Sequence, residues 1–121
     1  DVDVNDVSEA LTMIGDIKGK DVLIVDDMIS TGGTLFNAGN FLKKQGARSV
    51  RAAVTHGLFT GNAVKEFNES AIDELIVTDT LAQRDEISSH EKITIVSVAP
   101  LLAEAIKRIE TGKSISRDLI L

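Results

Sequence analysis

The sequence predicts an α/β domain in which a parallel sheet is flanked by helices. Short apolar segments rich in Val, Ile and Leu alternate along the chain with segments whose apolar residues recur at helical spacing. The first strand, the helix after it and the second strand fit within about 35 residues, the size of one βαβ unit, whose strands are parallel. Aromatic residues make up only 3% of the chain. The core therefore has to be aliphatic, as it is in helix-covered parallel sheets.

Composition narrows the class of protein further. With 121 residues, of which 43% are hydrophobic, the chain is long enough for one globular domain with a real core. It has no cysteine, so neither disulfides nor thiolate chemistry are expected. The net charge is −6 and no basic patch is visible, which argues against a nucleic-acid partner. The apolar runs are too short to span a bilayer and the acidic start is unlike a signal peptide, so we expect a cytoplasmic protein without a membrane partner.

Four segments are expected to form the parallel strands. The first, residues 22–25 (VLIV), is an apolar run bounded by polar residues, which is typical of a strand buried on both faces. The other three are residues 50–54, Glu74–Thr78 and Ile93–Val96. A further apolar run at residues 11–14 is expected to be a short edge strand.

Two helices are expected between these strands. Leu35, Ala38 and Leu42 fall on one face of the first helix, and Gly46 is placed to terminate it. Residues 61–67 are expected to form a second, short helix. We interpret the apolar stripe of the first helix as part of the core.

The last predicted helix has the clearest amphipathic pattern. Pro100 stands where a first helical residue would be, and Gly112 closes the helix. Its apolar stripe consists of Leu102, Ala105, Ile106 and Ile109. This stripe, too, is interpreted as core.

The segment VLIVDDMISTGGT, residues 22–34, carries the candidate chemistry. In open α/β sheets, ligands bind beyond the carboxyl ends of the strands, where this segment places two aspartates. A Thr-Gly-Gly-Thr loop then opens a helix, whose N-terminus has unsatisfied N–H groups and a partial positive charge. Glycines let the backbone approach an anion closely, and threonine hydroxyls add donors. A phosphate monoester fits this pattern.

The adjacent Asp26 and Asp27 call for a different partner. Two neighbouring carboxylates repel one another unless donors or a cation compensate their charge. Sugar hydroxyls are suitable donors. Hydroxyls on one side and a phosphate on the other together describe ribose 5-phosphate.

This segment resembles the phosphoribosyl-diphosphate-binding motif of the type I phosphoribosyltransferase fold, a Rossmann-like fold. Base-salvage phosphoribosyltransferases and ribose-phosphate pyrophosphokinases share that fold. The resemblance implies that Asp26 and Asp27 hold the ribose 2- and 3-hydroxyls. It also implies a set of phosphate-binding residues, namely Ser30, Thr31, Gly32, Gly33 and Thr34. Many kinases of this family have a third aspartate where this chain has Ser30.

Three later segments resemble the pyrophosphokinases in particular. They are THGLFTGNAV (residues 55–64), SAIDELIVTDT (residues 70–80) and LLAEAIKRIETGKSIS (residues 101–116). The resemblance implies the C-terminal, ribose-phosphate-binding part of an enzyme that transfers diphosphate from ATP to ribose 5-phosphate with Mg²⁺. It further implies a homo-oligomer that is built from dimers, with a hexamer as one form.

The domain boundaries follow from the same resemblance. Residues 1–10 are interpreted as the polar remnant of a preceding loop, and residues 11–121 as the ribose-phosphate-binding domain. In the pyrophosphokinases, a flexible loop carrying Lys and Arg lies just before the segment that corresponds to residues 11–14. Here the preceding residues contain neither. We therefore expect a fragment of a two-domain protein, inactive alone, without catalytic residues or metal ligands of its own.

Two other functions remain open at the level of sequence. One is a nucleobase phosphoribosyltransferase, which shares the loop but needs a hood that recognises a base. The other is a regulatory or associated subunit without catalytic activity. The intact aspartate pair and glycine loop favour binding of ribose phosphate in each case.

Five further residues lie outside the loop, and four of them have competing interpretations. Ser114 and Ser116 resemble a regulatory anion site of the family, but they also fit an ordinary tail. His56 and Asp79 follow strands. Each is interpreted either as a structural residue or as a neighbour of the site, and for Asp79 a role in a subunit contact is a further alternative. His90 lies in a polar stretch and is expected to be solvated.

Overall fold

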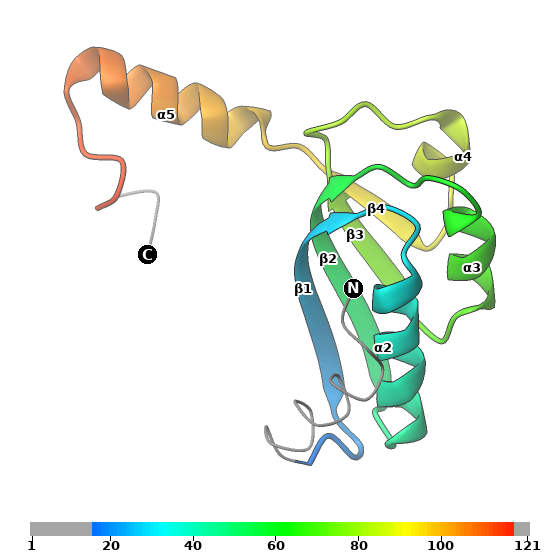
Figure 1. Ribbon diagram of the computed structural model, residues 1–121. Coiled ribbons are helices and arrows are strands. Elements are labelled where there is room, and N and C mark those ends of the chain that lie inside the picture. The colour runs from blue at the N-terminus through cyan, green and yellow to red at the C-terminus, as the bar shows by residue number, and fades with distance from the viewer. Residues whose placement is uncertain (1–15, 118–121) are drawn as a thin grey trace.

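The computed structural model describes residues 16–117, which contain a four-stranded parallel sheet in the order β1-β2-β3-β4 (Figure 1). The strands are β1 (Asp21–Ile29), β2 (Ser49–Gly57), β3 (Glu74–Thr78) and β4 (Ile93–Val96). The helices are α2 (Gly33–Lys44), α3 (Ala63–Glu69), α4 (Asp85–Ser88) and α5 (Ala99–Thr111). The predicted α/β class is confirmed. The expected edge strand at residues 11–14 and the segment 1–10 lie outside the described residues.

The core lies between the sheet and helices α2 and α3, which cover one of its faces (Figure 1). Parallel pairing places Ala52 of β2 beside Leu75 of β3, and Val54 beside Val77. All of these side chains are buried, as expected for aliphatic residues beneath a helical layer. The β3 and β4 ranges match those predicted. Helix α3 lies slightly further along the chain than residues 61–67, and α4 was not predicted.

Strand β1 differs from its prediction in length and in burial. It continues through both aspartates to Ile29 instead of ending at Val25. Leu23 and Val25 are 57% and 74% exposed, so the expectation of burial on both faces is wrong. The physical reason is that β1 lies at the edge of the described sheet, and no described helix packs on the face to which these two residues point.

Helix α2 follows the sequence pattern closely. Leu35 and Leu42 are buried in the core as predicted, whereas Ala38 is half-buried. The chain leaves the helix through Gly46, whose φ of 96° is the left-handed conformation that favours glycine after a helix. Phe36 lies 6.0 Å from Phe67 of α3, measured between ring centroids, so the two helices pack side by side.

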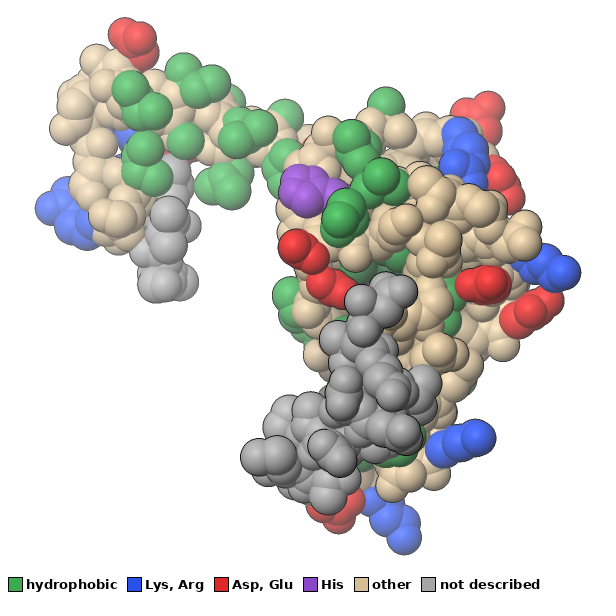
Figure 2. All heavy atoms as spheres, viewed as in Figure 1, with side chains coloured by type: hydrophobic (Ala, Val, Ile, Leu, Met, Phe, Trp, Pro, Cys, Tyr) green, Lys and Arg blue, Asp and Glu red, His purple; other side chains and the backbone are tan. Residues whose placement is uncertain are grey.

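Helix α5 contradicts the expectation that its apolar stripe is core. Leu102, Ile106 and Ile109 are 57%, 62% and 68% exposed. The helix extends away from the sheet (Figure 1), and its apolar side chains are visible along its surface (Figure 2). Its ends are as predicted, with Pro100 in the first turn and Gly112 in a left-handed conformation. The pattern thus predicted the helix correctly, but the described chain offers no surface that buries its stripe.

None of the helices within residues 16–117 combines the length and apolar character needed to cross a membrane.

Candidate functional site

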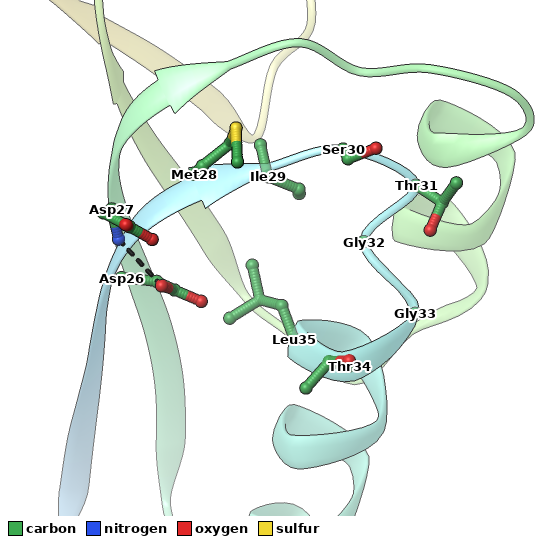
Figure 3. Close-up of a pocket in the computed structure, with 10 residues that line it drawn as sticks. All are labelled: Asp26, Asp27, Met28, Ile29, Ser30, Thr31, Gly32, Gly33, Thr34 and Leu35. Atoms are coloured by element: carbon green, nitrogen blue, oxygen red, sulfur yellow. Dashed lines mark hydrogen bonds between the residues drawn. The ribbon is translucent and has the colours of Figure 1, made fainter. Parts of the chain in front are cut away.

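The loop between β1 and α2 surrounds a hollow of about 300 Å³ at the carboxyl end of β1 (Figure 3). Its lining is a continuous segment from Asp26 to Leu35. Every residue predicted for ribose-phosphate binding is in this lining: Asp26, Asp27, Ser30, Thr31, Gly32, Gly33 and Thr34. The structure therefore brings these residues together around one space.

The strand side of the hollow is acidic. Asp26 and Asp27 are exposed near the end of β1, and one carboxylate oxygen of Asp26 accepts the Asp27 N–H at 2.8 Å. Across the described part of the chain, neither carboxylate forms an ion pair with Lys or Arg. As far as residues 16–117 are concerned, their remaining oxygens can accept from hydroxyl donors.

Gly32 shapes the opposite side. Its φ of 85° lies in the left-handed region, which glycine adopts without steric cost. A Cβ at this position would lie 2.3 Å from a ring carbon of Phe36. Because Phe36 is buried, its ring has little room to move. Both the backbone and the packing require glycine here.

The N-terminus of α2 faces the same hollow (Figure 3). The Phe36 N–H donates to Gly32 O at 2.8 Å, so the amides of Gly33, Thr34 and Leu35 precede the first helical hydrogen bond. No side chain within the described residues caps this end, and the first turn has no acidic residue. A Cβ on Gly33 would meet no atom within 4 Å. Free amides, a favourable helix dipole and open space are the features of an anion site.

The loop after β2 contacts the segment that lines the hollow. The sequence did not indicate this contact. The Thr60 N–H donates to Ser30 O at 2.9 Å, and the two side-chain hydroxyls are 3.1 Å apart. The sequence signal was the family-like segment at residues 55–64, in which His56 alone was considered as a neighbour of the site and Thr60 was given no role.

His56 and Asp79 lie at strand ends but not in the lining of the hollow. His56 is paired in register with Met28, and its Nδ1 is 2.8 Å from Thr80 Oγ1. Asp79 accepts the Val98 N–H at 2.9 Å, just before α5. Hydrogen bonds from Ser97 and Val98 lower the pKa of the Asp79 carboxyl. The structure therefore favours structural roles for both residues.

The expectation that His90 is merely solvated is wrong. Its Nε2 lies 2.6 Å from Asn68 Oδ1, and its ring centroid is 5.3 Å from that of Phe67. The side chain is half-buried and helps to cover the end of α3.

Ser114 and Ser116 lie at the far end of α5, away from the hollow (Figure 1). Ser114 O accepts a hydrogen bond from Arg108 Nη1 at 3.1 Å, and Ser114 Oγ accepts the Arg117 N–H at 3.1 Å. Both serines are exposed. The structure thus separates them from the ribose-phosphate candidates.

The parallel sheet and its loop define an α/β protein in which an uncapped helix N-terminus lines a hollow at a strand end. The chain belongs to the phosphoribosyl synthetase-associated domain family, whose profile matches residues 3–119.

Individual relatives agree with this assignment. The chain is 47% identical over 110 residues to the ribose-phosphate pyrophosphokinase of Vibrio cholerae. These 110 residues make up 91% of this chain and 35% of the relative. The enzymes of the same name from Haemophilus ducreyi and Hyphomonas neptunium are 46% and 43% identical over the same coverage. The chain thus spans about a third of the length of these curated relatives.

A solved structure supports the fold. The crystal structure of phosphoribosylpyrophosphate synthetase from Mycobacterium smegmatis matches with a TM-score of 0.75 and 40% identity, covering 81% of this chain and 33% of that one. The predicted resemblance to ribose-phosphate pyrophosphokinases is therefore confirmed. The narrower expectation of a C-terminal domain is not supported by the family match, which names an associated domain.

Proposed function

We propose that this chain is the ribose-phosphate-binding part of a cytoplasmic enzyme of nucleotide biosynthesis, which transfers diphosphate from ATP to ribose 5-phosphate and forms 5-phosphoribosyl 1-diphosphate. The observation that carries the proposal is that one hollow is lined both by a pair of carboxylates and by the uncapped N-terminus of a helix. The names of the relatives supply the reaction. The proposal includes a position in the C-terminal half of the full-length enzyme and a homo-oligomer built from dimers.

The ribose end of the ligand belongs at the strand. Carboxylates only accept hydrogen bonds, so Asp26 and Asp27 select a ligand group that donates, as vicinal sugar hydroxyls do. Hydrogen bonds to ionised groups are about twice as strong as neutral ones, so two carboxylates are well suited to hold the sugar in one orientation.

The phosphate end belongs at the loop. We expect the backbone N–H groups of Gly33 and Thr34 to donate to the phosphate. No charged side chain then has to lose its hydration when the anion binds. The hydroxyls of Ser30, Thr31 and Thr34 add neutral donors. This arrangement explains how a chain with a net charge of −6 can bind a phosphate.

The chain contributes position rather than chemistry. Phosphoryl-type transfer depends mainly on alignment and on charge stabilisation of the transferred group. Sugar hydroxyls held at Asp26 and Asp27, with the phosphate anchored at the loop, fix the direction of the ribose 1-hydroxyl. Within the described residues no group of three or more His, Asp or Glu side chains could hold a metal ion, so the protein ligands of the Mg²⁺ that would accompany ATP are placed outside this chain. Residues that bind ATP belong to the part of the relatives that this chain does not span.

Calorimetric titration with ribose 5-phosphate, with and without Mg²⁺, tests this proposal. We expect saturable binding by the wild-type chain and its loss in Asp26→Asn/Asp27→Asn, because each substitution removes the negative charge and replaces one of two acceptor oxygens with a donor. The control is Glu66→Gln/Glu110→Gln, which removes the same number of charges from exposed helical positions. Separate titrations with ribose and with inorganic phosphate assign each end of the ligand. Equal affinity of both double variants for ribose 5-phosphate would contradict the proposal.

The family name favours a second candidate, an associated subunit without catalytic activity. Mixing this chain with an active ribose-phosphate pyrophosphokinase distinguishes the two. A changed rate at saturating substrates supports the associated subunit, and an unchanged rate argues against it. A nucleobase phosphoribosyltransferase is disfavoured, because the relatives reported above are pyrophosphokinases.

A further inference from the structure

We propose that Thr60, in the loop after β2, is a positioning residue that orients the Ser30 hydroxyl for the phosphate of the ligand. The inference rests on the proposed function, since it concerns how the same hollow is held in its binding geometry. No part of the family resemblance assigns this role to Thr60.

Three contacts tie the loop after β2 to the phosphate loop. The Leu58 N–H donates to Ile29 O at 2.9 Å, and the Thr60 N–H donates to Ser30 O at 2.9 Å. The hydroxyls of Ser30 and Thr60 lie 3.1 Å apart. We call these contacts the loop clasp. It extends the pairing of β1 and β2 beyond their ends, so that the second loop fixes the first.

A strained residue makes the clasp possible. Phe59 has a φ of 51°, and it is the only residue other than glycine with a positive φ within the described chain. That conformation costs free energy for a side chain with a Cβ, so it persists only where the surroundings enforce it. Phe59 is fully buried, and a Cβ on Gly57 would lie 2.6 Å from its ring. Burial of the ring thus turns the backbone so that Thr60 reaches Ser30.

Side chains of the loop after β3 also hold this turn, through hydrogen bonds to its carbonyl groups. Arg84 Nη2 donates to Phe59 O at 3.1 Å, and Gln83 Nε2 donates to Gly57 O at 2.9 Å. At the carboxyl ends of the strands, the loop after β3 therefore contacts the loop after β2, which in turn contacts the loop after β1. The loop after β1 lines the hollow.

The chemistry of the two hydroxyls gives the contact a direction. A hydroxyl has one hydrogen to donate and can accept two hydrogen bonds. A phosphate oxygen is an acceptor, so Ser30 has to donate to it. Thr60 then has to donate to Ser30, which leaves the Ser30 hydrogen free for the ligand. Hydrogen bonds in such a chain also polarise and strengthen one another.

Titration of the 121-residue chain with ribose 5-phosphate tests this role. Thr60→Val keeps the shape of the side chain and removes the hydroxyl, and we expect Kd to rise about threefold to tenfold, the factor of one net hydrogen bond. Thr60→Ser restores the hydroxyl and should bind within about twofold of wild type. Thr94→Val, the same substitution at an exposed position of β4, serves as the control and should leave Kd unchanged.

A double-variant comparison separates positioning from general stability. If Thr60 acts through Ser30, then Thr60→Val adds nothing to the loss caused by Ser30→Ala. Wild-type affinity in Thr60→Val, or full additivity of the two losses, overturns the proposal.

Amide hydrogen exchange in the unliganded chain distinguishes failure of this inference from failure of the proposed function. The Phe36 amide donates to Gly32 O, so its exchange reports on the phosphate loop. We expect faster exchange of this amide in Thr60→Val, with the Leu75 amide of the core unchanged. A wild-type chain that binds no ribose 5-phosphate contradicts the proposed function and the ligand role of Thr60. Unchanged Phe36 exchange overturns the clasp whether or not the ligand binds.

Discussion

Among single residues, Gly32 shows most directly how local geometry fixes the candidate site. Its left-handed backbone turns the chain from β1 into α2, and the absence of a Cβ leaves room for the buried Phe36 ring. The same turn places the first residues of α2 in the lining of the hollow. A single position therefore connects backbone conformation, core packing and the proposed phosphate contact.

Substitution of Gly32 by alanine should destabilise the fold by more than its backbone conformation alone explains. The left-handed conformation costs about 1–2 kcal/mol for an L-residue, and the overlap with Phe36 adds about 1–3 kcal/mol. The matched control is Gly19→Ala, because Gly19 has a φ of 75° but a Cβ there would meet no atom within 4 Å. Urea denaturation should give a clearly larger loss for Gly32→Ala. Equal losses in the two variants would show that Phe36 does not restrict this position.

The sequence allowed the lining of the hollow to be predicted because the lining is continuous in the chain. Asp26 and Gly32 belong to one strand-loop-helix segment, so their proximity follows from local structure. Thr60 could not be found in this way, because its contact with Ser30 depends on the pairing of β2 with β1. The turn at Phe59 that completes the contact comes from burial of a ring, which no local propensity indicates.

At the scale of elements, α2 and α5 show what an amphipathic pattern leaves undetermined. Both helices were predicted from apolar residues at helical spacing, and both exist. Leu42 of α2 is buried, whereas Leu102 of α5 is 57% exposed. Spacing determines which side of a helix is apolar, but burial depends on whether another surface is present. The same reasoning applies to Val25 of β1, which is apolar but lies on the uncovered face of an edge strand.

The same substitution in these two helices should therefore have very different effects on stability. Leu42→Ala leaves a cavity in the core and should lower the free energy of unfolding by about 2–5 kcal/mol. Leu102→Ala removes an exposed side chain and should change it by no more than about 0.5 kcal/mol. Chemical denaturation of both variants measures the difference. A loss above about 1 kcal/mol for Leu102→Ala would mean that α5 packs against a surface of this chain in solution.

For the molecule as a whole, parallel pairing places the loops after β1, β2 and β3 at the same end of the sheet, beyond the carboxyl ends of the strands. Of these loops only the one after β1 lines the hollow, so the described lining lies within a chain that spans about a third of its relatives. At the opposite end of the sheet, where the strands begin, another residue links several elements. Asp73, just before β3, accepts the Val50 N–H of β2 at 2.8 Å and forms an ion pair with Lys43 of α2 at 3.0 Å.

The link at Asp73 should make part of the stability depend on pH. Burial acts to raise the pKa of the Asp73 carboxyl, but the hydrogen bonds from Val50 and Lys43 outweigh it, so the pKa is lowered on folding. A lowered pKa means that the stabilisation is fully present above the ordinary aspartate range near pH 4 and is lost as pH falls below it.

Comparison of Asp73→Asn with wild type across pH measures this contribution. Near pH 7 the variant should be less stable than wild type, by less than about 1 kcal/mol, because solvent screens a partly exposed ion pair. As pH falls through the lowered pKa of Asp73, the two proteins should converge, since the wild-type carboxyl then takes up a proton and loses the same charge. All other acidic groups titrate in both proteins, so the difference between their unfolding free energies isolates Asp73. A difference that stays constant across the whole acid range in which both proteins remain folded would show that the contact with Val50, and not the charge, links β2, β3 and α2 here.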